Sequence, residues 1–131
     1  MDGVVLAGGY ATRLRPTSLS VSKHLVPLAN KPVIGWVLEQ LAAAGVRRVF
    51  VVVGPHNREQ IAEYVGDGSK FGVSAEYVLQ ERPLGIAHAL SLLEGLIGGD
   101  IVVYLGDNLV QGGVARYAKR FEEARAEAMV L

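Results

Sequence analysis

The sequence VVLAGGYATRLRP, residues 4–16, decides the expected fold, because an apolar run leads directly into two adjacent glycines. The run Val4–Ala7 is typical of a strand that is covered on both faces of a parallel sheet. Gly8 and Gly9 allow the backbone to turn sharply and to approach a ligand with no Cβ in the way. Successive amide groups in such a turn bind anions, and the guanidinium of Arg13 is suited to phosphate. A tight turn followed by a surface arginine is the alternative, and these residues alone leave both open.

Three further strand-like runs alternate with helix-like segments along the rest of the chain. The runs are Val49–Val53, Val73–Leu79 and Ile101–Leu105. Apolar residues recur at helical spacing between and after them, as in these three sets: Ile34, Val37, Leu38 and Leu41; Ile86, Leu90, Leu93 and Ile97; Val114, Tyr117, Ala118 and Phe121. We expect a doubly wound, mainly parallel α/β sheet in a three-layer αβα arrangement, with strand order 3-2-1-4. Met129–Leu131 resembles the start of another strand.

Two local patterns mark helix ends. Pro32 suits the first turn of one helix and Gly45 its end. Asn57 with Gln60 has the spacing of a capping box that opens the next helix. Of the three histidines, which match no metal spacing, only His24 is expected near a site, because it follows Lys23.

Composition narrows the class of protein. The chain has 131 residues, of which half are apolar, with 13 basic and 13 acidic side chains and no cysteine. This excludes an intrinsically disordered chain, and the balanced charge argues against a nucleic-acid or polybasic membrane binder. The absence of cysteine excludes disulfides, thiolate zinc sites and a cysteine nucleophile. With no run near 18 apolar residues and no basic region ahead of an apolar signal core, we expect a cytoplasmic protein.

Two charged residues could share a site with the glycine loop. Lys23 alone is most simply a solvated surface charge, and Asp107 is either a metal or ribose ligand or a loop-starting residue. Ligands of doubly wound sheets bind beyond the carboxyl ends of the strands, where the strand order reverses. Because the first and fourth strands are neighbours there, the Gly8–Arg13 loop and Asp107 are expected to face each other across one crevice.

The chain resembles the sugar-phosphate nucleotidylyltransferases, also called nucleoside-diphosphate-sugar pyrophosphorylases. The matching motifs are LAGGxxTRLxP (6–16), SKxLxPL (22–28), KPxI (31–34), GDGS (66–69), QxxPxGxAxA (80–89) and LGDN (105–108). They cover essentially the whole chain in the family's order, and the resemblance is closest to the glucose-1-phosphate thymidylyltransferase group. It implies a Rossmann-like fold of the nucleotide-diphospho-sugar transferase type.

The resemblance also implies a reaction, a cofactor and site residues. An oxygen of a sugar 1-phosphate, with glucose 1-phosphate favoured, would attack the α-phosphorus of dTTP or UTP and release pyrophosphate. Arg13, Lys23 and Asp107 would be the catalytic residues, with Asp107 holding Mg²⁺. Nucleotide-binding residues would be Leu6, Ala7, Gly8, Gly9, Thr12, Arg13, Lys23, Gln80, Pro83 and Gly85. Leu6 and Gly8 would line the base and ribose, whereas the amide of Gln80 and the backbone of Gly85 would read the edge of the base.

The sequence departs from the family at two points. Ala11 replaces a usual glycine, which a helical turn from Ala11 would tolerate. The family's catalytic domain is considerably longer, and its second metal-binding aspartate and the lysine of a Glu-Lys-Pro motif have no counterpart. We therefore expect residues 1–131 to be the nucleotide-binding part of a single catalytic domain that is cut short at its C-terminus. A non-catalytic regulatory or assembly subunit, or a nucleotide-binding fragment, is the alternative. The expected partners are the two substrates and a second copy of the chain, with neither nucleic acid nor membrane.

Overall fold

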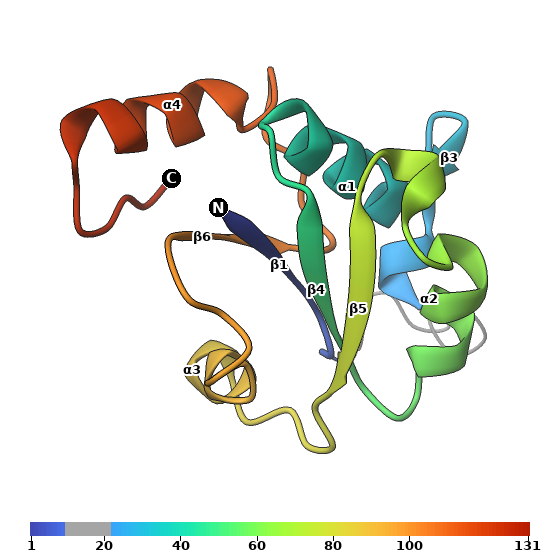
Figure 1. Ribbon diagram of the computed structural model, residues 1–131. Helices are drawn as coiled ribbons and strands as arrows, with labels where there is room; N and C mark the ends of the chain where they lie inside the picture. Colours follow the sequence, from blue (N-terminus) through green and yellow to red (C-terminus); the bar gives the residue numbers. More distant parts are fainter. Residues whose placement is uncertain (10–21) are drawn as a thin grey trace.

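A parallel sheet runs through the centre of the molecule (Figure 1). The computed structural model describes residues 1–9 and 22–131. Four strands make up this sheet: β1 (Asp2–Ala7), β4 (Arg48–Val53), β5 (Ser74–Leu79) and β6 (Ile101–Leu105). Their order is β5-β4-β1-β6 and all three pairings are parallel, so the order predicted from the sequence is confirmed.

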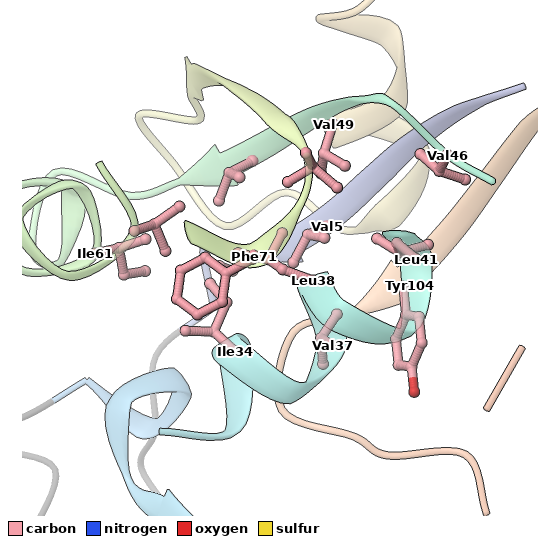
Figure 2. Close-up of a cluster of buried hydrophobic side chains, with 14 of the residues drawn as sticks. Val5, Ile34, Val37, Leu38, Leu41, Val46, Val49, Ile61, Phe71 and Tyr104 are labelled. Atoms are coloured by element: carbon pink, nitrogen blue, oxygen red, sulfur yellow. The ribbon is translucent and has the colours of Figure 1, made fainter. Parts of the chain in front are cut away.

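Apolar side chains are buried on both faces of the sheet. Val4 and Val5 of β1 are neighbours in the sequence and point to opposite faces, yet neither is exposed. Val5 belongs to a core with Ile34, Leu38 and Ile61, which come from helices α1 (Val33–Ala43) and α2 (Arg58–Val65) (Figure 2). Two buried layers explain why β1 and β4 contain continuous apolar runs, whereas Val103 and Leu105 of β6 are 39% and 40% exposed.

A single short helix covers much of the second face. Val4, Phe50 and Val52 pack there against Ala89 of α3 (Ile86–Ser91) and Leu93 just beyond it. The predicted three-layer arrangement is therefore confirmed, although the helix is shorter than the predicted apolar stripe. Ile86 begins α3 but is largely exposed, because only the following turns face the sheet.

The remaining elements lie at the ends and edges of the sheet. They are the 3₁₀ turns η3 (Lys23–Leu25) and η4 (Ser69–Phe71), the hairpin strands β2 (Pro27–Leu28) and β3 (Lys31–Pro32), and helix α4 (Ala115–Ala124). Helix α1 begins one residue after Pro32 and is followed by Gly45, whose φ of +86° a glycine adopts readily. No residue of α4 is buried, although Val114 before it joins the core of the α1 face.

The predicted strand at Met129–Leu131 is wrong. Residues 126–131 have no regular structure, and the side chain of Val130 is 92% exposed. A strand needs a neighbouring backbone with which to exchange hydrogen bonds, and none lies beside this apolar run in the described residues. None of the helices in residues 1–9 and 22–131 is both long and apolar enough to span a bilayer.

Candidate functional site

Three neighbouring strands each lead into a glycine at their carboxyl end. These are Gly8 after β1, Gly54 after β4 and Gly106 after β6. A Cβ on Gly8 would lie 2.9 Å from Oε1 of Gln80, and one on Gly106 would lie 2.9 Å from Cδ2 of His24. A Cβ on Gly54 would come within 2.5 Å of the ring of His56. These positions leave no room for a Cβ, because polar side chains already occupy the space.

An ion pair joins the two sides of the predicted crevice. Nζ of Lys23, in η3, lies 3.1 Å from Oδ2 of Asp107, which follows β6. A Cβ on Gly9 would be 3.7 Å from the same Nζ atom, so the lysine also lies beside the glycine loop. Both side chains of the pair are partly exposed, at 24% and 34%. Of the predicted residues, the structure thus brings Gly9, Lys23 and Asp107 together at the carboxyl ends of β1 and β6, whereas Thr12 and Arg13 lie outside the described residues.

Asn57 connects the ends of two strands to the start of η3. Its side chain is 1% exposed, and its Nδ2 donates to the carbonyl of Ala7 at 2.6 Å and to Oγ of Ser22 at 3.4 Å. Its Oδ1 accepts the backbone N–H of Gly54 at 2.9 Å. These bonds hold both flanks of residues 8–21 against β4, since Ala7 precedes that segment and Ser22 follows it.

The capping box predicted from Asn57 and Gln60 is therefore wrong. No side-chain hydrogen bond caps the N-terminus of α2. Instead, Oε1 of Gln60 accepts the backbone N–H of Ser22 at 3.1 Å, while Asn57 bonds to Ala7 and Gly54. The buried backbone groups at these strand ends would otherwise lack partners, and burying an unpaired polar group costs more than leaving a helix end to water.

His24 is buried and uncharged, and it directly follows Lys23 of the ion pair. Its Nδ1 lies 3.1 Å from Oγ of Ser22, which accepts from Asn57 and so is free to donate to the ring. Burial lowers the pKa of His24 from 6.5 to about 4, and the charge of Lys23 lowers it further than Asp107 raises it. Ser22 and His24 are both buried, so the serine is not presented as a nucleophile despite its contact with a histidine.

Gln80 reaches from the end of β5 toward the glycine loop. Its side chain is 6% exposed and its Nε2 donates to the carbonyl of Gly85 at 3.2 Å and contacts Nδ1 of His88 at 3.0 Å. The structure thus brings Gln80 and Gly85 together as expected, and Gly85 has a φ of +97° at the start of α3. Nε2 is already bonded within the chain, so the amide that is expected to read the edge of the base has no free donor. Pro83 lies exposed in the connecting loop, whereas Leu6 is half-buried and Ala7 is buried.

The expectation that only His24 lies near the site is wrong. His56, three residues beyond the end of β4, places Nε2 3.4 Å from the carbonyl of Gly9. His88, one turn into α3, contacts Gln80. Spacing alone does not reveal these positions, but nearness to the carboxyl end of a strand or to a loop glycine is a signal that applies to both.

The acidic residues limit how a metal could be held. No group of three His, Cys, Asp or Glu side chains suited to a metal occurs in the described part of the chain. Asp107 is the carboxylate at the crevice, and Mg²⁺ commonly binds one or two carboxylates together with substrate phosphates and water. A single carboxylate beside backbone amides therefore fits a cation that is bound jointly with a polyphosphate.

The sheet order defines a Rossmann-like α/β protein, and proteins of this architecture bind ligands where the strand order reverses. The chain belongs to the nucleotidyl transferase family, whose model matches residues 2–131. This confirms the family resemblance of the motifs.

Individual proteins agree with this membership. The chain is 44% identical over 123 residues to the low-salt glycan biosynthesis nucleotidyltransferase Agl11 of Haloferax volcanii, covering 93% of this chain and 34% of that protein. It is 45% identical over 129 residues to a glucose-1-phosphate thymidylyltransferase of Streptomyces antibioticus, covering 98% of this chain and 36% of the relative. The chain therefore spans about a third of the length of these relatives.

Solved structures show the same fold. A Bacillus anthracis structure named as a glucose-1-phosphate thymidylyltransferase in complex with sucrose superposes with a TM-score of 0.88 at 34% identity. The match covers 94% of this chain and 50% of the other. A UDP-glucose pyrophosphorylase complexed with UDP-glucose has a TM-score of 0.76 at 21% identity, covering 95% and 54% of the two chains, which shows the fold alone.

Proposed function

We propose that residues 1–131 are the nucleotide-binding part of a nucleotidyltransferase catalytic domain. The domain would transfer a nucleotidyl group from dTTP or UTP to a sugar 1-phosphate, with glucose 1-phosphate as the first candidate, and release pyrophosphate. The observation that carries this proposal is the Lys23–Asp107 pair, 3.1 Å apart beside Gly9, in a chain of the nucleotidyl transferase family.

The proposed roles follow from charge and position. Lys23 would contact the α-phosphate and the leaving pyrophosphate, where an ammonium donates charge-assisted hydrogen bonds. Asp107 would hold Mg²⁺, which when bound neutralises phosphate charge. The two side chains neutralise each other in this structure, so substrate binding would exchange one internal ion pair for contacts to phosphate and cation. Gly8 and Gly9 would offer amides, and Thr12 and Arg13 would complete the triphosphate site.

The reaction places modest chemical demands on the protein. A phosphate oxygen of the sugar 1-phosphate is already a nucleophile, so the protein must align the reactants and offset their charge. This agrees with a site built from glycines, Lys23 and Asp107, in which the one serine–histidine contact described is buried. The resemblance places the groups that align the sugar 1-phosphate beyond residue 131.

Binding and turnover measured together would test the proposal. Calorimetric titration with dTTP and with UTP, with Mg²⁺ present, should show binding. Lys23→Ala should weaken nucleotide binding about 10–100-fold, because a hydrogen bond to a charged group contributes roughly 1.5–3 kcal/mol. Lys119→Ala is the matched control, because that lysine is 77% exposed on α4 and pairs with Glu123. Equal affinities of Lys23→Ala and the parent protein would refute the assignment.

Pyrophosphate release with glucose 1-phosphate tests the division of the domain. Residues 1–131 alone should bind the nucleotide without releasing pyrophosphate, because the groups that align the sugar 1-phosphate are expected beyond residue 131, and robust release would refute this division. That the protein is cytoplasmic and that it assembles as a homo-oligomer remain predictions.

A further inference from the structure

The carboxamide of Gln80 is held in one orientation by two acceptors. Nε2 carries two hydrogens, and its two contacts are the carbonyl oxygen of Gly85 at 3.2 Å and Nδ1 of His88 at 3.0 Å. An amide nitrogen only donates, so Nδ1 of His88 must be the unprotonated ring nitrogen that accepts. Both donors of Gln80 are therefore used within the chain.

The opposite orientation of the amide would be unfavourable. It would bring Oε1 of Gln80 toward the carbonyl oxygen of Gly85. Both atoms are acceptors, so no hydrogen would lie between them. It would also require the other tautomer of His88, with the hydrogen on Nδ1. Gln80 is almost fully buried, so water cannot readily relieve such contacts.

The fixed orientation decides which atom faces the glycine loop. Oε1 lies 2.9 Å from the position that a Cβ on Gly8 would take, so it is directed across the end of β4 toward β1. No donor to Oε1 is found among residues 1–9 and 22–131, and these residues contain no fully buried side-chain oxygen without a partner. Oε1 is therefore a partly exposed acceptor with no donor among these residues.

We propose that His88 is a positioning residue that sets base specificity by presenting Oε1 of Gln80 to the nucleotide. This rests on the proposed function, in which Gln80 meets the edge of the base. A base at this position must donate an N–H, as thymine and uracil do from N3. Cytosine has an acceptor at N3 and would face Oε1 with no hydrogen between them. Guanine also carries a ring N–H, so the choice between pyrimidines and purines is not assigned to His88.

Two nearly isosteric substitutions isolate this role. In His88→Asn the side-chain oxygen can take the place of Nδ1 and accept from Gln80, whereas His88→Leu places a methyl group there. Ser91→Ala is the control, because Ser91 is exposed on α3 and donates only to the backbone carbonyl of His88. Thermal unfolding of each variant shows whether the fold is retained.

The measurement is the ratio of the dissociation constants of dCTP and dTTP, obtained by calorimetry with Mg²⁺ present. The parent protein, His88→Asn and Ser91→Ala should all prefer dTTP. His88→Leu should lower the preference about 2- to 10-fold, which corresponds to one neutral hydrogen bond. The triphosphate of 3-methylthymidine, which lacks the N–H at N3, should bind the parent protein more weakly than dTTP.

The possible failures are distinguishable. Equal affinity of the parent protein for dTTP and dCTP would overturn the inference, as would an unchanged ratio in His88→Leu. The same loss of preference in both His88→Asn and His88→Leu would also overturn it, because the Asn variant keeps the acceptor. In these cases dTTP binding still supports the proposed function, whereas a parent protein that binds no nucleoside triphosphate overturns both.

Discussion

Acid should destabilise this protein through His24. The residue is buried, and its Nδ1 accepts from Oγ of Ser22 in the folded chain. Burial lowers its pKa from 6.5 to about 4; the nearby charges are Lys23 and His56, which lower it, and Asp107, which raises it. Between these two values the unfolded chain binds a proton at His24 that the folded chain does not.

The sign and size of the effect follow from this difference in proton binding. The free energy of unfolding has its full value above pH 6.5 and falls as the pH is lowered toward 4. The separation between 6.5 and about 4 corresponds to a total loss of about 3 kcal/mol, of which about 2 kcal/mol falls between pH 7 and pH 4.5.

Urea unfolding followed by circular dichroism at several pH values between 7 and 4.5 measures this loss. Asp2 and Asp67 also have lowered pKa values, by hydrogen bonds to Arg48 and Ser69 respectively, so the parent protein loses stability in acid for other reasons too. A His24→Asn variant keeps those carboxylates and an acceptor near Ser22 but cannot titrate.

The stability difference between the parent protein and His24→Asn should therefore shrink by about 2 kcal/mol from pH 7 to pH 4.5. A difference that stays constant across this range would refute the reasoning, since it would mean that His24 takes up its proton equally in both states.

Three further predictions concern single residues of the site. Asn57→Ala should lower the free energy of unfolding by about 2–4 kcal/mol, because it leaves buried backbone groups unpaired, and a loss below about 1 kcal/mol in urea unfolding would contradict this. Asp107→Asn keeps the shape but removes the charge, so nucleotide affinity in a Mg²⁺ titration should depend less on the metal; an unchanged dependence would identify Asp107 as a loop-starting residue. Gly106→Ala should cost about 1–3 kcal/mol, since its Cβ would lie 2.9 Å from the His24 ring, whereas Gly98→Ala, with open space around it, should be nearly neutral; similar unfolding midpoints for both would argue against close packing at Gly106.

Most of the fold could be predicted because its cause is repeated along the chain. β1, β4 and β6 each contain a continuous apolar run, and the intervening helices have their own periodicity. Neighbouring residues such as Val4 and Val5 can both be apolar only where both faces of a sheet are covered, which also implies parallel strands and crossover helices. The strand order predicted from the sequence is the usual one of doubly wound sheets, and the structure confirms it.

Predictions from short patterns were less secure. Met129–Leu131 has the composition of a strand but no partner strand in the described residues. Asn57 and Gln60 have the spacing of a capping box, yet the amide of Asn57 bonds to Ala7, 50 positions earlier. A local pattern shows which hydrogen bonds a side chain is able to make, and the competing partners decide which of them it does make.

The sequence by itself determined the class of fold, the edge of the sheet at which a site is expected, and the residue types expected there. Gly8, Gly9, Lys23 and Asp107 are all recognisable from motifs in the sequence. Only the tertiary structure decided how the supporting side chains are paired: Asn57 with Ala7, His24 with Ser22, and His88 with Gln80. Asn57 reaches Ala7 because the carboxyl ends of the parallel strands β1 and β4 meet at one edge of the sheet, which brings together residues 50 positions apart.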